Sequence, residues 1–254
     1  MEINGSSISE AWANAFIKVS EMPGKIITPL VLTINIPQKE ANWENQNIRK
    51  YVDELLSSKP NLQNKSIQTV ANTIFPYWMW NKSKPAEAFF KWYASLLPRV
   101  RKCQGNANGV YFERMTSFEN GSERVNQLQH VLNTWDKKNH RKSALQAGIF
   151  DPRQDHTDQR MRGFPCLQQI GFIPLGRNGK NGFMVSAYYP TQYMFQKAYG
   201  NYLGLCRLGL FMAHYMKLTF TTLTCYIGAA EIEAELTSAE SKKIARKLKG
   251  LLGK

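Results

Sequence analysis

The sequence predicts an α+β domain built on one large, mostly antiparallel or mixed β-sheet that is flanked by helices. Apolar residues recur at helical spacing in several segments. Runs rich in β-branched and aromatic residues lie between these segments and indicate strands. With 254 residues and 43% hydrophobic content, the chain is long enough for one large domain with a sizeable core. We find no internal repeat and no linker that would divide it.

Periodicity and turn residues place the elements along the chain. Ser6, Ser7 or Ser9 suits the N-cap of the first helix, while prolines and glycines between the patterns end helices and strands. Residues 176–182 form a glycine-rich turn between two extended runs and predict a hairpin. The expected helices are 8–20, 45–56, 66–75, 85–97, 125–135 and 200–216. The expected strands are 26–36, 183–189 and 217–227, with further strands after Lys142 and after Cys166.

Residues 200–216 differ from the other helical segments because they are apolar on nearly every side. A helix of that kind is buried, so we expect this one at the centre of the core. Residues 151–162 are polar and charged, and we interpret them as an exposed loop ahead of Cys166.

The net charge of +14 at pH 7 calls for an explanation. An anionic partner such as a nucleotide or nucleic acid is one, and a basic surface without a specific ligand is the other. No apolar run reaches the ~18 residues that a membrane span needs, and the start of the chain lacks the pattern of a secretory signal. Four unevenly spaced cysteines and four scattered histidines predict a reduced, cytoplasmic protein without a metal site.

Residues 160–172 concentrate the features of a reactive cysteine. Cys166 follows Phe-Pro, with Arg160 and Arg162 upstream and Gln168 and Gln169 downstream. Arginines near a thiol favour the thiolate, which is the nucleophile, and so lower the pKa of the thiol. The alternative is a structural cysteine at the mouth of a buried strand, since free cysteine is among the most buried residue types.

Segments on both sides of Cys166 follow the motif order of a known family. Segments 109–114 (Gly-Val-Tyr-Phe-Glu-Arg), 125–133 (with Gln-Leu-Gln) and 141–145 (Arg-Lys-Ser-Ala-Leu) precede it, and 200–205 (Gly-Asn-Tyr-Leu-Gly-Leu) follows it. In this order the chain resembles the thymidylate synthase family. The resemblance implies a thymidylate synthase-like domain over residues 1–236, with two copies packing their sheets back to back as a homodimer.

The resemblance also implies a reaction. In that family a cysteine thiolate adds to C6 of a pyrimidine nucleotide, and C5 then attacks a one-carbon unit carried by a reduced folate, 5,10-methylenetetrahydrofolate. Cys166 matches the nucleophile, and Arg141 with Lys142 matches a phosphate-binding pair that reaches into the neighbouring subunit's site. Asn201 matches the asparagine that reads the base. The other residues expected to bind the nucleotide are Arg162, Gln168 and Gln169.

Several residues of the family pattern are replaced. Leu167 stands where a histidine is usual, and segment 188–193 lacks the arginine and aspartate of the family's Tyr-x-Arg-Ser-x-Asp. Segment 228–234 lacks the histidine and tyrosine that bind the sugar, and the folate-closing C-terminal segment is not recognisable. Hydrogen bonds to charged groups contribute about 1.5–3 kcal/mol each, so these losses weaken binding of an ordinary nucleotide.

Two functions therefore stay open. The first is a divergent enzyme that transfers a methyl or hydroxymethyl group to C5 of a pyrimidine nucleotide through Cys166, with folate as carbon donor. The second is a catalytically inactive relative, without a cofactor, that senses a nucleotide or binds a partner or nucleic acid.

Residues 237–254 predict a basic amphipathic helix at the C-terminal end. Its leucines and Ile244 lie on one side, with lysines and Arg246 on the rest. Such a helix either packs on the domain through its leucines or serves as an arm for a protein or nucleic-acid partner. Because the motifs lie upstream, we expect the core to fold without it.

Overall fold

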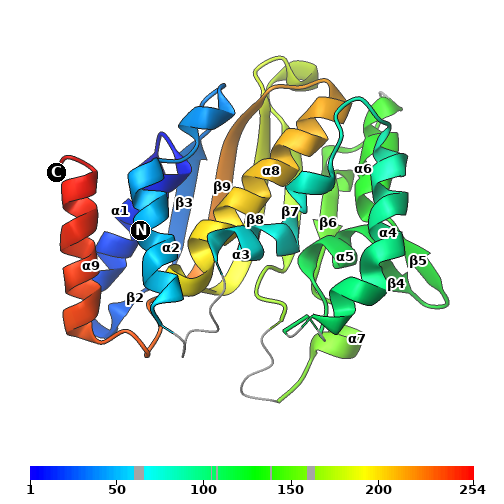
Figure 1. Ribbon diagram of the computed structural model, residues 1–254. Coiled ribbons are helices and arrows are strands. Elements are labelled where there is room, and N and C mark those ends of the chain that lie inside the picture. Colours follow the sequence, from blue (N-terminus) through cyan, green and yellow to red (C-terminus); the bar gives the residue numbers. More distant parts are fainter. Residues whose placement is uncertain (60–65, 104, 107, 138, 159–163) are drawn as a thin grey trace.

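The computed structural model describes the chain except for residues 60–65, 104, 107, 138 and 159–163 (Figure 1). The described α-helices are α1 (Ile8–Glu21), α2 (Gln46–Ser57), α3 (Ile67–Ile74), α4 (Ala86–Lys102), α5 (Tyr111–Thr116), α6 (Gln127–Asp136), α7 (Pro152–Asp155), α8 (Tyr199–Met216) and α9 (Ser238–Leu251). The described strands are β1 (Glu2–Gly5), β2 (Ile26–Ile27), β3 (Leu30–Asn35), β4 (Phe118–Asn120), β5 (Glu123–Val125), β6 (Gln146–Gly148), β7 (Gln169–Pro174), β8 (Phe183–Tyr193) and β9 (Phe220–Glu231).

Seven of the described strands form one mixed sheet, as the sequence predicts. Its order is β1-β3-β9-β8-β7-β6, and β2 also pairs with β9. The β1–β3 and β8–β9 pairs are parallel, and the other pairs are antiparallel. The parallel strands β8 and β9 are joined through α8, which crosses over the sheet (Figure 1). The strands β4 and β5 form a separate hairpin, joined by the turn residues Gly121 and Ser122.

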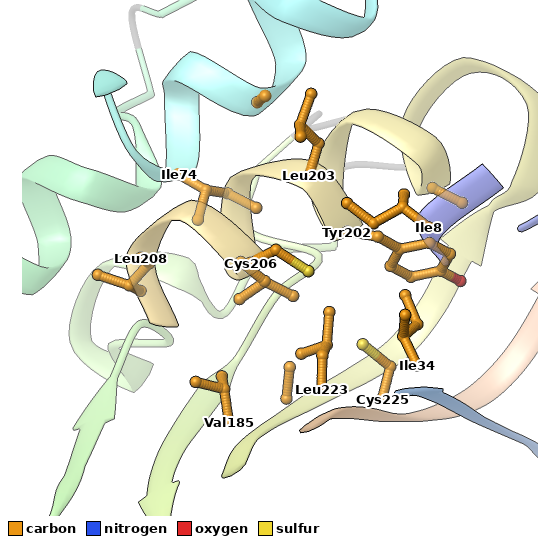
Figure 2. Close-up of a cluster of buried hydrophobic side chains, with 14 of the residues drawn as sticks. Ile8, Ile34, Ile74, Val185, Tyr202, Leu203, Cys206, Leu208, Leu223 and Cys225 are labelled. Carbon is orange, nitrogen blue, oxygen red and sulfur yellow. The ribbon is translucent and has the colours of Figure 1, made fainter. Parts of the chain in front are cut away.

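Helix α8 lies at the centre of the core, as its all-round apolar pattern predicts. Figure 2 shows Tyr202 and Cys206 of α8 directed toward the sheet residues Ile34, Leu223 and Cys225. All five side chains are fully buried. The sulfur atoms of Cys206 and Cys225 are both free thiols in this cluster.

Glycines let α8 approach its neighbours closely. A Cβ atom on Gly204 would lie 2.8 Å from the Ala71 carbonyl oxygen of α3 and 2.8 Å from the Ile74 Cβ. A Cβ on Gly200 would similarly lie 2.5 Å from the Val70 Cβ. Larger residues at these two positions would push α3 away from α8, so the close packing of the two helices depends on the glycines.

Helices gather on one face of the sheet, and the opposite face is left open. Tyr188 and Tyr226 lie side by side on the open face, 38% and 47% exposed, with ring centroids 5.8 Å apart. Except for Glu231 at the end of β9, strands β3, β6, β7, β8 and β9 present no Asp, Glu, Lys or Arg on this face. Their other side chains there include Val31, Thr33, Asn35, Gln146, Gly148, Gln169, Gly171, Ile173, Met184, Ser186, Tyr188, Pro190, Thr222, Thr224, Tyr226 and Gly228.

Several predicted element boundaries are wrong, and strands β8 and β9 each extend four residues past their expected ends. The expected strand over 26–36 is split into β2 and β3, because Thr28 and Pro29 interrupt the pairing and proline has no N–H to donate. Helix α4 continues through Pro98 to Lys102 instead of ending at Leu97. The carbonyl group that Pro98 cannot pair with belongs to Ala94, and both residues lie on the exposed side of α4 where water can replace the lost bond.

The predicted C-terminal helix is present as α9, which packs against α1. Ile244, Ala245 and Leu248 are buried, so the leucine side faces the domain. Ion pairs fasten both ends of α9: Lys59 bonds Glu240, and the Lys249 Nζ lies 2.8 Å from the Glu21 Oε1. Of the two alternatives, the structure shows the packed helix, and its basic residues form the outer side.

Within the part of the chain that the structure describes, none of the helices combines the length and apolar character that crossing a bilayer would require. The same described residues contain no group of three or more His, Cys, Asp or Glu side chains arranged to hold a metal ion.

The packing of α9 gives a first prediction. Leu248→Ala should lower the free energy of unfolding by about 3 kcal/mol, because it removes a fully buried side chain between α9 and α1. Chemical denaturation measures this change. The exposed neighbour provides the control, since Lys247→Ala should change stability by less than about 0.5 kcal/mol. Equal effects of the two substitutions would mean that α9 does not contribute to the stability of the core.

Candidate functional site

The candidate site forms where the segment before β7 meets the N-terminal end of α8. Cys166 lies in that segment and is exposed. Its backbone N–H donates to the Tyr111 hydroxyl at 3.3 Å, and the Tyr111 ring lies 5.1 Å from the ring of Phe164. Tyr111 is the first residue of helix α5, so this helix helps to position the segment that carries Cys166.

The pKa of the Cys166 thiol is raised above its ordinary value, which corrects the expectation that neighbouring arginines lower it. Protein atoms around the thiol raise the pKa by desolvation, although the residue itself is exposed. The ammonium of Lys197 opposes this effect and favours the thiolate. Arg160 and Arg162, on which the expectation rested, lie outside the described residues.

A buried phenol lies near the cysteine. Tyr189 of β8 is fully buried, and within the described part of the chain its hydroxyl has no hydrogen-bond partner. Burial raises the pKa of Tyr189 well above its ordinary value, and Tyr111 and Cys166 are close enough to add to this shift. A buried hydroxyl without a partner is costly, and a ligand that enters the site could supply the missing bond.

Helix α8 and the turn before it supply the other side of the site. Lys197 belongs to η7 (Met194–Ala198), a π-helical turn that continues into α8. Asn201 follows four residues later and is only 3% exposed. Tyr199 packs on Trp12 of α1, and the rotation of a helix places the Asn201 side chain about 200° around α8 from Tyr199, away from α1.

The remaining predicted residues do not converge on Cys166 within one chain. Arg141 and Lys142 are exposed, at the start of the 3₁₀ turn η5 (Lys142–Ala144) before β6. Gln168 and Gln169 instead line a cavity of about 430 Å³ at the edge of the sheet. The other residues that line it are Gln127, Gln146, Gly148, Phe150 and Tyr188. The predicted Arg162 lies outside the described residues.

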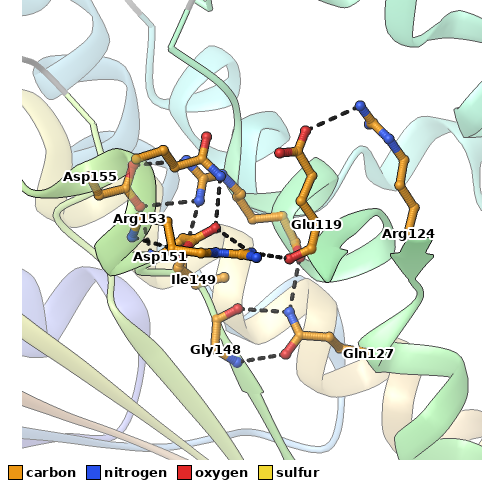
Figure 3. Close-up of polar contacts among 10 residues, drawn as sticks. Glu119, Arg124, Gln127, Gly148, Ile149, Asp151, Arg153 and Asp155 are labelled. Atoms are coloured by element: carbon orange, nitrogen blue, oxygen red, sulfur yellow. Dashed lines mark hydrogen bonds and ion pairs between the residues drawn. The ribbon is translucent and has the colours of Figure 1, made fainter. Parts of the chain in front are cut away.

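The predicted exposed loop before Cys166 is wrong in part, because Asp151 and Asp155 are buried. Figure 3 shows both carboxylates among arginines. The Arg114 guanidinium pairs with Asp155 through bonds of 2.8 and 3.1 Å and also donates to the Ile149 carbonyl at 3.3 Å. The Asp151 carboxylate accepts from Arg153, which holds the pKa of Asp151 well below its usual range.

This network supports the cysteine segment from one side. Arg114 lies in α5, Asp155 ends the short helix α7, and the guanidinium carbon of Arg114 stands 5.3 Å from the centroid of the Phe164 ring. The pair therefore ties α5 and α7 to the residues just before Cys166. One signal in the sequence could have revealed it, since Asp151 followed by Pro152 is the pattern of a helix N-cap and first position.

A buried carboxylate holds the turn that carries Lys197. Glu233 follows β9, is 3% exposed, and accepts the backbone N–H groups of Phe195 at 3.2 Å and Gln196 at 2.7 Å. Burial raises the pKa of Glu233 to about 7, with a further upward effect from Glu235. Tyr193, whose own pKa is raised in part by Glu233, is another titratable group near it, and the Lys25 ammonium donates to the Glu233 backbone carbonyl at 3.4 Å.

The raised pKa of Glu233 gives a second prediction. The folded protein binds more protons at this group than the unfolded chain between pH 4.5 and 7, so its contribution to stability is present below pH 4.5 and is lost as the pH rises through 7. The Glu233→Gln variant should lack this loss, which amounts to roughly 3 kcal/mol. Urea denaturation at pH 4.5 and 7.5 compares the two proteins. Identical pH dependence in both would contradict the assignment.

No protein-family model matches this chain, and no curated protein matches it.

Proposed function

We propose that the chain is a cytoplasmic enzyme that transfers a one-carbon group to C5 of a pyrimidine nucleotide, with Cys166 as the nucleophile. The observation that carries the proposal is the surroundings of this cysteine: an exposed thiol near the buried hydroxyl of Tyr189, which has no hydrogen-bond partner among the described residues. The motif order that resembles the thymidylate synthase family supports it, as does the large mixed sheet flanked by helices.

In this proposal the residues around Cys166 have distinct tasks. The Cys166 thiolate forms a bond to C6, which makes C5 nucleophilic toward the one-carbon unit. Asn201, buried near the start of α8, would bond the edge of the base. Tyr111 holds the backbone of Cys166 through its hydroxyl.

The C-terminal segment does not support the expected carbon donor. A reduced folate such as 5,10-methylenetetrahydrofolate would supply the carbon, but the C-terminal residues that would close over it are engaged elsewhere. Helix α9 packs on α1, and the Lys254 Nζ bonds the Asn14 Oδ1 of α1 at 2.8 Å. The described residues therefore do not fit a folate-closing role for this segment, and we derive no step through the folate.

A third prediction tests the nucleophile. Cys166→Ser should reduce the release of tritium from C5 of tritiated uridine and cytidine monophosphates by about 1000-fold or more, because a hydroxyl is a far weaker nucleophile than a thiolate. The assay is run with and without the reduced folate. Cys103→Ser, at another exposed cysteine, is the matched control and should leave the rate unchanged. Unchanged release in the Cys166 variant would refute the proposal.

A second candidate is a catalytically inactive protein that binds a nucleotide. The raised pKa of the Cys166 thiol favours it, because a protonated thiol is a poor nucleophile. The outer side of α9 would then bind a nucleic acid or protein partner through residues Lys242, Lys243, Arg246 and Lys247. Nucleotides that raise the melting temperature without any release of tritium would favour this candidate over the enzyme.

We also propose that the open face of the sheet is a homodimer interface. A face on which five strands carry one charged side chain, Glu231 at the end of β9, is unusual in a chain with a net charge of +14. Protein interfaces are depleted in charge at their centre and enriched in tyrosine, and Tyr188 and Tyr226 occupy the middle of this face. Back-to-back packing would also allow the exposed Arg141 and Lys142 to reach a second copy.

A fourth prediction follows for the dimer. Tyr226→Glu should convert the protein to a monomer at micromolar concentration, because it places a charge where two sheets would be desolvated against each other. Light scattering after gel filtration measures the mass. Trp78→Glu, at a tryptophan that is 66% exposed in η4 (Tyr77–Met79), is the matched control and should remain dimeric. A monomeric parent protein would contradict the interface.

A further inference from the structure

Two tryptophans lie in contact on the surface of the protein. Trp78 of η4 and Trp92 of α4 are 66% and 46% exposed. Their ring centroids are 5.8 Å apart, and the two rings stand nearly perpendicular, at 81°. A single exposed apolar residue is common, whereas two tryptophans in contact form a continuous apolar surface of the kind that marks a binding site.

The helix that carries Trp92 is basic beside this tryptophan. Because a helix turns by about 100° per residue, Lys91, Arg99 and Lys102 project within about 100° of Trp92 around α4. All three are exposed, and the acidic residue of α4, Glu87, lies outside this arc. The other two residues within the arc are small, Ala88 and Ser95. This side of α4 therefore offers an indole ring and three cations with no bulky side chain between them.

The three cations are available to a ligand. Among the described residues, Lys91, Arg99 and Lys102 have no carboxylate within ion-pair distance, whereas the neighbouring Arg101 pairs with Glu113 at 2.7 Å. They extend over about 16 Å of the helix, from Lys91 to Lys102. Like charges in a row repel one another, so an extended anion that meets all three would relieve this repulsion.

The combination of rings and cations favours one class of ligand. Single-stranded nucleic acid binds to proteins by stacking its bases on aromatic side chains while basic residues follow its phosphates. A membrane surface would require exposed aliphatic side chains beside the tryptophans, and η4 and α4 present none. The exposed large apolar residues of the described chain are Met1, Ile26, Trp78, Trp92, Tyr188, Tyr193 and Tyr226.

We propose that the α4 surface, formed by Trp78, Trp92, Lys91, Arg99 and Lys102, binds single-stranded nucleic acid. The two indoles stack with bases, and the three cations contact phosphates. Figure 1 shows α4 and α9 at opposite ends of the fold, so this surface is distinct from the basic side of α9. It also contains none of the residues assigned to the one-carbon reaction, and the inference does not depend on that reaction.

The test measures the binding of fluorescein-labelled oligonucleotides of about 12 nucleotides to the full chain by fluorescence polarisation. Oligothymidylate and oligoadenylate are compared over a series of salt concentrations, because oligoadenylate has no pyrimidine for the site at Cys166. The parent protein should bind both, since every base has a face that can stack, and the affinity should fall as salt rises. Binding of oligothymidylate alone, or of neither, would overturn the inference.

A fifth prediction concerns the stacking of bases. Trp92→Leu should weaken the binding of both oligonucleotides by roughly 10-fold, because leucine has no ring on which a base can stack. Trp92→Phe keeps a ring and should lose less than about 3-fold. Neither variant removes a charge, so the salt dependence should stay that of the parent. Equal losses in the two variants would reject stacking on Trp92.

The cations of α4 have a separate readout. The double variant Lys91→Ala/Arg99→Ala should reduce the slope of log affinity against log salt by about 1.4, since each phosphate contact on a single strand contributes about 0.7. The matched control is Lys18→Ala/Lys180→Ala, which removes two exposed charges from α1 and the turn between β7 and β8. Its slope should equal that of the parent. An equal reduction in both double variants would mean that net charge, and not the α4 surface, attracts the nucleic acid.

Anionic vesicles test the membrane alternative. Vesicles of phosphatidylserine and phosphatidylcholine are sedimented with the parent and with Trp92→Leu. The same amount of protein should sediment in both cases, because the α4 surface lacks the aliphatic side chains that enter a bilayer. Sedimentation of the parent that Trp92→Leu abolishes would identify a membrane-binding surface and overturn the inference. Trp92 is exposed, so the variant should melt like the parent, and a thermal melt checks this.

Discussion

Helix α8 packs against the sheet on one side and against α3 on the other, and the remaining elements are arranged around this contact. Glycines at 200 and 204 bring α3 so close that a methyl group would overlap its backbone. On the sheet side, Tyr202, Cys206 and Gly209 meet β8 and β9 with no exposed surface. Because protein interiors are close-packed, a displacement of α8 would be transmitted to the sheet and to α3 together.

The candidate site inherits its geometry from this contact. Lys197 and Asn201 stand at the start of α8, whose position is fixed by the core, and Tyr189 belongs to the strand on which α8 lies. Cys166 comes from a different part of the chain, and the buried Arg114–Asp155 pair fixes the elements on either side of it. The two halves of the site are thus positioned by different forces, apolar packing on one side and a buried ion pair on the other.

The periodic elements could be predicted from the sequence because their burial follows local spacing. Helix α8 is the clearest case, since apolar residues on every side leave no exposed face. The site residues outside the resemblance were harder to predict. In the sequence, nothing distinguishes Lys197 from an ordinary lysine before a helix, and only the fold brings it near Cys166.

The burial of the charged residues before Cys166 could not be predicted from the local sequence. Composition indicates an exposed loop there, yet Asp151 and Asp155 are buried because Arg114, some 40 positions earlier in the chain, pairs with one of them. The end of β8 is similar, because the alternation of buried and exposed residues breaks after Tyr189, where Gln192 rather than Thr191 is buried. Long-range partners and irregularities in a strand leave no local pattern.

The order of the sheet has a consequence for how the protein is made. Strand β9 is the last of the described strands in the chain, yet it lies in the middle of the sheet between β3 and β8. While the chain emerges from the ribosome, the β1–β3 pair and the β6–β7–β8 unit have no strand to join them until residues 220–231 are released. Until then the two parts of the sheet have unpaired edges. The pairing of β9 that completes the sheet is therefore a late event, and it joins residues far apart in sequence.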